Sequence, residues 1–325
     1  MQSGEDRLIA RHFGPLATAK GALSLGDDAA FFAPPPGYEL VLTTDAVVAG
    51  VHFLPDDPPE TIGRKLLRVN LSDLAAKGAV PRGYLMTAAF PRGASETWIS
   101  AFARGLKQDQ AHFGISLLGG DTVSTPGPAS FTATLIGEVA KTMLRRADAR
   151  VGDLVCVSGT IGDGGFGLAE LQSPQPGLTP QQRRFLIARS RLPQPRVRLG
   201  PLLHGIAHAA LDVSDGLVQD LGHIARQSGV GIEIGLGSVP LSPAGRAVAA
   251  ADAGARNRAI TSGDDYEIAF TVPPGRLVAI ETAARAARTR VTVIGHVVKG
   301  EGVAVRDAKG GKLAIGQGGF DHFAR

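Results

Sequence analysis

The chain has 325 residues, 44% of them hydrophobic, a balance typical of one or two globular domains with a substantial core. A single cysteine, Cys156, excludes an internal disulfide and is expected to be a small buried hydrophobe, and no apolar run reaches the roughly 20 residues of a membrane helix. Glu5 and Asp6 precede any apolar run, so no signal peptide is visible and we expect a cytoplasmic protein without a membrane partner.

The first half alternates strand-like and helix-like segments. Residues 39–43 predict a strand that ends in Thr44 and Asp45, and residues 58–77 predict a helix that Asp57 can cap. Further strands are expected at 84–90, 115–118 and 131–139, with an amphipathic helix at 95–113. A basic and then polar segment at 141–152 predicts a boundary between domains 1–140 and 141–325.

The second half continues the alternation. Strands are expected at 154–158, 231–234, 266–272 and 291–297, and helices at 166–171, 181–190, 197–206, 217–227, 243–253 and 276–288. Strands mixed with helices in both halves predict two α/β domains with mixed sheets.

Six acidic motifs among glycines, hydroxyls and small apolar residues are the strongest functional signal. They are Gly26-Asp27-Asp28, Thr43-Thr44-Asp45, Asn70-Leu71-Ser72-Asp73, Gly119-Gly120-Asp121, Asp212-Val213-Ser214-Asp215-Gly216 and Gly263-Asp264-Asp265-Tyr266-Glu267. Few basic residues lie inside them, and oxygen ligands suit magnesium, so converging carboxylates with several cations and a phosphorylated ligand are expected.

Asp73 occupies a position where the helix at 58–77 should bury an apolar side chain. Ile62, Leu66, Val69 and Ala76 share its stripe, and an unpaired carboxylate there would cost several kcal/mol. The alternatives are a salt bridge, for example to Lys77, or a metal ion, which the other acidic motifs favour.

The remaining motifs also have plain structural interpretations. Asp27-Asp28 and Asp264-Asp265 follow glycines and could form turns, although adjacent like charges favour a bridging cation. In the motif that contains Asp212, either Ser214 or Asp215 could cap a helix, but capping needs only one such side chain.

Three other patterns are weaker. Residues 162–167 match G-x-G-x-x-G but lack the acidic residue about 20 positions later, which favours a tight turn with close helix packing. His204 and His208 are spaced as in a zinc helix without its glutamate, so both are expected to be ordinary helix residues. Six arginines could suggest nucleic acid but fit a solvated face better: Arg183, Arg184, Arg189, Arg191, Arg196 and Arg198.

Taken in order, these motifs resemble the thiamine-monophosphate kinase family of the aminoimidazole-ribonucleotide-synthetase-like superfamily. The resemblance runs from about Gly4 to Phe323 and includes the long motif at 43–53 and the terminal Gly-Phe-Asp-His-Phe. It implies a two-domain fold, an N-terminal domain that binds ATP and magnesium, and a homodimer formed by pairing of the N-terminal sheets.

The resemblance also implies roles for individual residues. The implied metal ligands are Asp28, Thr43, Thr44, Asp45, Asp73, Asp121, Asp212 and Asp215. The implied ATP contacts are Gly120, Asp121, Arg146 and Ser214, and the implied contacts of thiamine phosphate are His52, Asp264 and Phe320. Catalysis is expected to depend on Asp73, Asp121, Asp215 and Arg146. Two positions depart from the family's pattern: relatives often carry Glu at position 264, and Trp or Tyr also occurs at position 320.

The chemistry expected is direct, in-line transfer of the γ-phosphoryl group of ATP to thiamine monophosphate. A phosphate acceptor is largely ionised at neutral pH and requires no general base. The alternatives are another ATP-dependent synthetase of the superfamily and a non-catalytic nucleotide-binding maturation factor.

Overall fold

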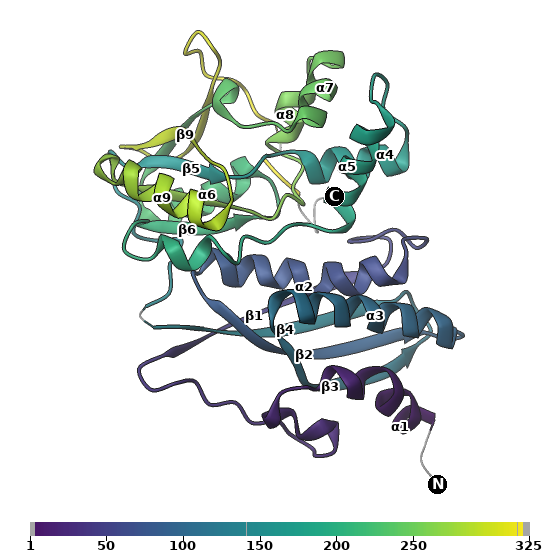
Figure 1. The fold of residues 1–325 in the computed structure, drawn as a ribbon. Coiled ribbons are helices and arrows are strands. Elements are labelled where there is room, and N and C mark those ends of the chain that lie inside the picture. Colours follow the sequence, from purple (N-terminus) through teal and green to yellow (C-terminus); the bar gives the residue numbers. More distant parts are fainter. Residues whose placement is uncertain (1–3, 141, 317, 321–325) are drawn as a thin grey trace. The chain divides into compact units, whose positions relative to one another are not determined.

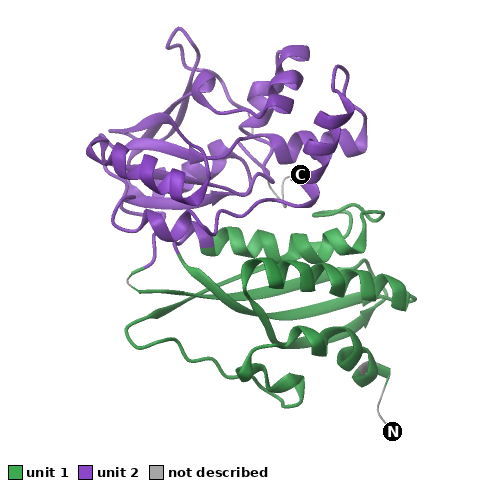
Figure 2. Cartoon of the chain, viewed as in Figure 1, with its two compact units in different colours: residues 1–74, 79–142 green, residues 75–78, 143–325 purple. Residues whose placement is uncertain are grey.

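A computed structural model describes residues 4–140, 142–316 and 318–320. The chain separates into two compact units: unit 1 comprises Met1–Leu74 and Ala79–Thr142, and unit 2 comprises Ala75–Gly78 and Met143–Arg325 (Figure 2). Each unit contains its own sheet. In the described part of the chain, no helix is long and apolar enough to cross a membrane.

Unit 1 is built on a four-stranded sheet of order β1-β4-β2-β3 (Figure 1). The strands are β1 (Glu39–Val48), β2 (Val80–Pro91), β3 (Ser116–Thr125) and β4 (Ser130–Val139). β4 is antiparallel to both β1 and β2, whereas β2 and β3 are parallel. The short segments α1 (Gly4–Leu8), η1 (Ile9–Phe13), η2 (Gly14–Leu16) and η3 (Lys20–Leu25) precede the sheet.

Two helices cover one face of this sheet, α2 (Pro59–Ala76) and α3 (Glu96–Phe113) (Figure 1). Ser95 caps α3 by accepting a hydrogen bond from the Trp98 amide at 3.2 Å. The helices approach closely at Gly105, where a Cβ would lie 2.0 Å from the Glu60 carbonyl oxygen. The opposite face of the sheet leaves large apolar side chains exposed, including Leu42 and Val123.

Unit 2 contains a six-stranded sheet of order β10-β7-β9-β5-β8-β6. Its strands are β5 (Leu154–Ser158), β6 (Ala209–Val213), β7 (Gly231–Gly235), β8 (Glu267–Val272), β9 (Val291–Val298) and β10 (Gly302–Arg306). α6 (Leu217–Ser228) packs on one face, and α9 (Leu277–Ala287) with η4 (Gly200–Leu203) packs on the other. Cys156 is fully buried, as expected, and burial raises the pKa of its thiol to about 12.

A group of helices forms a third apolar cluster in unit 2. It comprises α4 (Asp163–Gln172), α5 (Pro180–Arg191), α7 (Pro243–Ala251) and α8 (Ala255–Ala259). The short elements η5 (Leu236–Ser238) and η6 (Pro274–Arg276) complete the unit.

The helix expected at 197–206 is wrong, because only the 3-10 turn η4 forms there. Pro201 lacks an amide donor, and Gly205 adopts a left-handed φ of 71° that ends the segment. Gly200 also packs against the chain, since a Cβ there would lie 1.9 Å from the Ala75 carbonyl oxygen. Strands β6 and β10 were not among the expected elements.

Candidate active site

In unit 1, Asp73 on α2 contacts the strand β1, which carries the predicted ligands Thr43, Thr44 and Asp45. The hydroxyl of Thr43 on β1 donates a hydrogen bond to Asp73 Oδ2 at 2.5 Å. The side chain is half-buried, and Ile62, Leu66 and Val69 of the same stripe are buried as expected. A neutral hydroxyl leaves the negative charge of Asp73 uncompensated, which suits a carboxylate that binds a cation.

Asn70 orients this region, although only Asp73 of the Asn70-Leu71-Ser72-Asp73 motif was predicted as a site residue. Its side-chain oxygen accepts a hydrogen bond from the Asp45 amide at 3.0 Å, and its Nδ2 donates to the Leu66 carbonyl at 2.9 Å. Asn70 is completely buried. It therefore ties β1 to α2 beside the position from which Asp73 projects.

The strand register divides the Thr43-Thr44-Asp45 motif between two faces. Thr43 and Asp45 lie toward α2, whereas Thr44 points to the open face and accepts a hydrogen bond from the Thr134 hydroxyl at 3.1 Å. Asp121 also lies on the open face, because it aligns with the exposed Thr87. Two strands separate β1 from β3, which places Thr44 and Asp121 at least three strand spacings, about 14 Å, apart.

A cavity of about 450 Å³ brings two of the acidic motifs together. It is lined by Asp27, Asp28, Gly120 and Asp121, with an apolar wall that includes Phe31. Further lining residues are Leu85, Met86, Leu117 and Ile136. Asp27 Oδ1 accepts a hydrogen bond from the Asp28 amide at 2.8 Å, so a turn explains Asp27 and leaves Asp28 as the candidate ligand.

Gly120 is required by the shape of this cavity wall. Its φ is 153°, and a Cβ at this position would lie 1.8 Å from the Met86 carbonyl oxygen. The close approach of β2 and β3 at this point presents Asp121 at the cavity. The glycine of the Gly-Gly-Asp motif is thus a structural requirement of the site.

His52 follows β1 in a tight turn of unit 1. Its Nδ1 accepts a hydrogen bond from the Val48 amide at 3.1 Å, and Lys65 donates to its carbonyl at 2.8 Å. Because Nδ1 acts as an acceptor, the neutral ring carries its hydrogen on Nε2. His52 can therefore offer a donor from a fixed ring.

In unit 2, a buried carboxylate shapes the loop that carries Ser214 and Asp215. Asp220 Oδ2 accepts hydrogen bonds from the amides of Ser214, Asp215 and Gly216, each at 3.1 Å. Burial raises the pKa of Asp220 to about 7, and the charge of Asp215 adds to this shift. The helix cap suggested for Ser214 or Asp215 is wrong, because neither side chain caps α6.

Two predicted residues of unit 2, Asp264 and Phe320, contact that loop through their backbone amides. The Asp264 amide donates to the Ser214 carbonyl at 2.8 Å, and the Phe320 amide donates to the Asp215 carbonyl at 2.9 Å. Gln219 Nε2 donates to the Phe320 carbonyl at 2.9 Å. The structure thus brings Ser214, Asp215, Asp264 and Phe320 together, and Phe320 remains 49% exposed.

Arg146 lies near helix α6. It is exposed, and its carbonyl accepts a hydrogen bond from the Ser228 hydroxyl at 3.2 Å. The pKa of His223 is lowered, first by burial and then by the positive charges of Arg146 and Arg226. The charge of Asp215 opposes this shift, so Arg146 and Asp215 act on one part of α6. Asp212, at the end of β6, is buried.

Two expectations for the weaker patterns need correction, and one is confirmed in part. His204 and His208 lie outside the helices: His204 Nε2 contacts the Gly78 carbonyl and His208 Nδ1 contacts Asp153. Of the six arginines, Arg189 and Arg196 turn inward to Glu267 rather than forming a solvated face. In the glycine-rich segment 162–167 the close helix packing is confirmed, because a Cβ on Gly167 would lie 2.0 Å from the Leu186 carbonyl oxygen of α5, but residues 163–167 begin helix α4 rather than a tight turn.

The acidic motifs do not form a metal cage from protein side chains alone. Among residues 4–140, 142–316 and 318–320, no three His, Cys, Asp or Glu side chains are close enough to hold an ion. Asp265 is not one of the available carboxylates, because both its oxygens accept backbone amides of the glycine-rich segment.

Comparison with known proteins gives one consistent result. Residues 26–139 match the N-terminal domain, and residues 150–308 the C-terminal domain, of AIR synthase related proteins. The thiamine-monophosphate kinase of Caulobacter vibrioides is 46% identical over 91% of this chain and 84% of its own length. The crystal structure of thiamine-monophosphate kinase from Stenotrophomonas maltophilia K279a is 39% identical, with a TM-score of 0.81 over 92% of this chain and 94% of that chain. AaThiL complexed with AMPPCP and TMP is 32% identical, with a TM-score of 0.78 over 94% and 93%.

Proposed function

This chain belongs to the thiamine-monophosphate kinase family of AIR synthase related proteins, and from this premise we propose that it phosphorylates thiamine monophosphate with ATP. The products are thiamine diphosphate and ADP. The observation that carries the proposal is the 46% identity to the Caulobacter kinase over 91% of this chain. We place the reaction in the cytoplasm, where a lone buried thiol such as Cys156 stays reduced.

ATP is assigned to unit 1 residues at the cavity and to two residues of unit 2. Gly120 allows the backbone to bend at the cavity wall, and Asp121 presents a carboxylate there. Arg146 and Ser214 supply a cation and a hydroxyl suited to phosphate oxygens. The complex of AaThiL with AMPPCP and TMP supports the presence of both substrates on one protein of this family.

Thiamine monophosphate is assigned to His52, Asp264 and Phe320. The Nε2 hydrogen of His52 can donate to a phosphate oxygen, since Nδ1 is occupied by a backbone amide. The exposed ring of Phe320 can face the cationic thiazolium, a contact of about 0.5–2 kcal/mol. Asp264 can add a negative charge near the same cation.

The reaction is a direct in-line displacement without a covalent enzyme intermediate. The acceptor phosphate has a second pKa of about 6, so its attacking oxygen is already ionised at neutral pH. The main obstacle is repulsion between two anions, about 4 kcal/mol for each pair of unit charges at 4 Å in an intermediate dielectric. The work of the protein is therefore to orient the phosphates and offset their charge.

The donor set fits magnesium. The implied ligands are aspartates and threonine hydroxyls, which are hard oxygen donors: Asp28, Thr43, Thr44, Asp45, Asp73, Asp121, Asp212 and Asp215. Magnesium usually takes only one or two carboxylates from a protein and completes its shell with water and phosphates, so dispersed aspartates suit it. When bound, such ions would neutralise phosphate charge.

We also propose that the protein is a homodimer paired through the open sheet faces of unit 1. Leu40, Leu42, Leu85 and Val123 are 41–63% exposed on these strands, an apolar surface typical of an interface. Thr44 and Asp121 lie on the same open face but too far apart to share an ion within one chain. Analytical ultracentrifugation should give the mass of two chains, and a monomer at micromolar concentration would contradict the pairing.

The direct test of the kinase is product formation from ATP and thiamine monophosphate, with and without magnesium. We expect stoichiometric ADP and thiamine diphosphate with magnesium, and loss of turnover after chelation. Thiamine and formylglycinamidine ribonucleotide serve as control acceptors. Turnover of the ribonucleotide but not of thiamine monophosphate would assign the chain to another reaction of the superfamily.

A further inference from the structure

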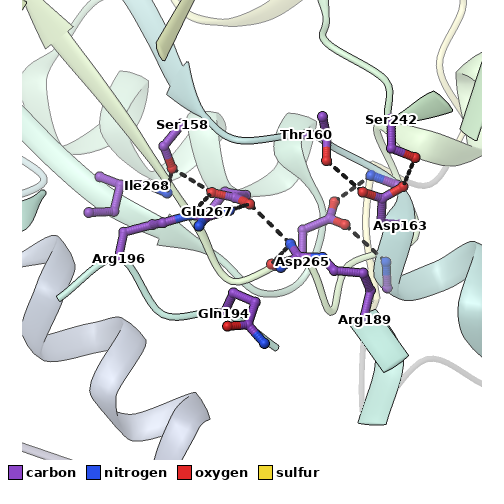
Figure 3. Close-up of polar contacts among 12 residues, drawn as sticks. Ser158, Thr160, Asp163, Arg189, Gln194, Arg196, Ser242, Asp265, Glu267 and Ile268 are labelled. Atoms are coloured by element: carbon purple, nitrogen blue, oxygen red, sulfur yellow. Dashed lines mark hydrogen bonds and ion pairs between the residues drawn. The ribbon is translucent and has the colours of Figure 1, made fainter. Parts of the chain in front are cut away.

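A buried charged cluster in unit 2 is built around Asp265 and Glu267 (Figure 3), close in sequence to Asp264. Glu267, the first residue of β8, is completely buried and accepts hydrogen bonds from three side chains. Ser158 Oγ donates at 2.7 Å, Arg189 Nη2 at 3.0 Å and Arg196 Nε at 2.5 Å. Two arginines on one carboxylate fix the start of β8 in place.

Asp265, two residues before Glu267, is the second buried anchor of the loop at 263–266. Its Oδ2 accepts a hydrogen bond from the Gly162 amide at 2.7 Å, and its Oδ1 accepts one from the Gly164 amide at 3.2 Å. Arg189 also donates to the Asp265 carbonyl at 3.2 Å, so one guanidinium holds both anchors. Asp265 is 1% exposed, and its burial raises its pKa well above the usual range.

The glycine-rich segment leaves room for this loop. A Cβ on Gly164 would lie 2.1 Å from the Asp264 carbonyl oxygen, and one on Gly165 would lie 2.2 Å from Ser262 Oγ. A Cβ on Gly159 would lie 2.1 Å from Glu267 Oε1. The G-x-G-x-x-G pattern at 162–167 therefore has a structural role: its glycines allow the loop to pack against them.

The loop needs such support because its backbone is strained. Asp264 has a φ of 61° and Tyr266 a φ of 52°, left-handed conformations that side chains with a Cβ rarely adopt. Each strained residue is followed directly by a buried anchor, Asp265 or Glu267. Surrounding contacts must therefore overcome the local backbone preference at two positions.

We propose that Asp265, Glu267, Arg189 and Arg196 are positioning residues that hold Asp264 in the geometry required to recognise the acceptor. The proposal rests on the acceptor role proposed for Asp264. None of the four touches the reacting atoms; they act through the backbone of residues 263–266. Their loss should weaken binding of the cationic acceptor and leave the nucleotide bound normally.

The first test is Gly164→Ala, with Gly275→Ala as the matched control. Gly164 has no positive φ, so alanine conflicts with Asp264 without adding backbone strain of its own, whereas a Cβ on Gly275 meets nothing within 4 Å. We expect the KM for thiamine monophosphate to rise about 10- to 100-fold in Gly164→Ala, the scale of a loop displaced by about 1 Å. The KM for ATP should change less than about twofold.

Asp265→Asn is the second variant, because it preserves size but replaces one acceptor with a donor facing an amide. It should raise the KM for thiamine monophosphate but not the KM for ATP. A purely structural role would lower the melting temperature and reduce kcat through loss of active protein, with both KM values unchanged. That result in either folded variant, or an equal rise of both KM values, would overturn the proposal.

Hydrogen exchange on the unaltered protein gives a measurement that does not depend on variant folding. The amides of Asp264 and Tyr266, which donate to the Ser214 and Val213 carbonyls, should be protected without substrate. Exchange as fast as in an exposed loop would overturn the proposal. Absence of thiamine monophosphate turnover in the unaltered protein, with these amides protected, would instead refute the kinase assignment.

Discussion

The two units present their candidate ligands in different ways. In unit 1, Asp45 and Asp121 lie on strands and Asp73 lies on a helix, so regular backbone hydrogen bonding fixes their positions. In unit 2, Asp215 and Asp264 lie on loops without a sheet partner, and each has a buried carboxylate nearby that accepts backbone amides. Loops are less precise platforms than helices and strands, and the buried carboxylates compensate for this.

Asp73→Asn should have the largest effect and tests the unit 1 half of the comparison. Asparagine can still accept the Thr43 hydrogen bond, so the fold should persist while the charge is lost. We expect kcat to fall about 100- to 1000-fold, the usual cost of removing one electrostatic contact of a transition state. Glu281→Gln, an exposed change on α9, is the control, and both melting temperatures should match the parent. Normal turnover of Asp73→Asn would show that Asp73 is not an essential ligand.

Gly120→Ala tests whether the strands of unit 1 really need their close approach. The Cβ would meet the Met86 carbonyl at 1.8 Å in a backbone conformation of φ 153°. We expect a loss of about 2–4 kcal/mol in the free energy of unfolding, from strain and overpacking together. Gly119→Ala is the matched neighbour, because its Cβ would meet only a flexible leucine tip at 3.4 Å. Equal stability of the two variants in urea unfolding would contradict this account.

Phe320→Ala addresses the exposed part of the unit 2 loops. Loss of a cation–π contact of about 0.5–2 kcal/mol should weaken thiamine monophosphate binding by about 2- to 30-fold. Because the Phe320 backbone bonds persist in the variant, the 214–216 loop should keep its shape. Phe320→Trp should bind at least as tightly as the parent. Calorimetric titration that finds equal affinity for all three proteins would remove Phe320 from the site.

The contrast between the units also explains what could be predicted from the sequence. Asp73 was recognisable because helical periodicity placed it among buried apolar residues, a local pattern. Asp264 and Asp265 are identical in type and adjacent, yet only Asp265 is an anchor. That difference depends on Gly162 and Gly164, about 100 residues earlier in the chain, and no local pattern carries it. Strand β10 was missed for the same reason, since it pairs in parallel with β7.

Substitution of Asp163 should have the smallest effect on turnover. It tests whether a buried carboxylate of unit 2 is structural rather than functional. Asp163 is completely buried, accepts hydrogen bonds from Thr160 and Ser242, and has a pKa raised by burial. The Asp163 carboxyl group therefore binds its proton more tightly in the folded state than in the unfolded state, which stabilises the fold at low pH. That stabilisation is lost as pH rises from about 4 through the folded pKa. This contribution to the free energy of unfolding therefore declines with increasing pH.

Asp163→Asn should make that decline shallower, because the amide stays neutral at every pH and can accept one of the two hydroxyl hydrogen bonds. Urea unfolding followed by circular dichroism between pH 4 and 8 measures the slope directly. Asp252→Asn is the control, since the pKa of this exposed carboxylate is lowered by Arg258 and its contribution to stability is nearly constant over this range, so the slope should not change. The kcat of Asp163→Asn at neutral pH should stay within about twofold of the parent, unlike that of Asp73→Asn. A large loss of kcat with unchanged stability would show that a buried carboxylate of unit 2 participates in the reaction, and the distinction between anchors and ligands would fail.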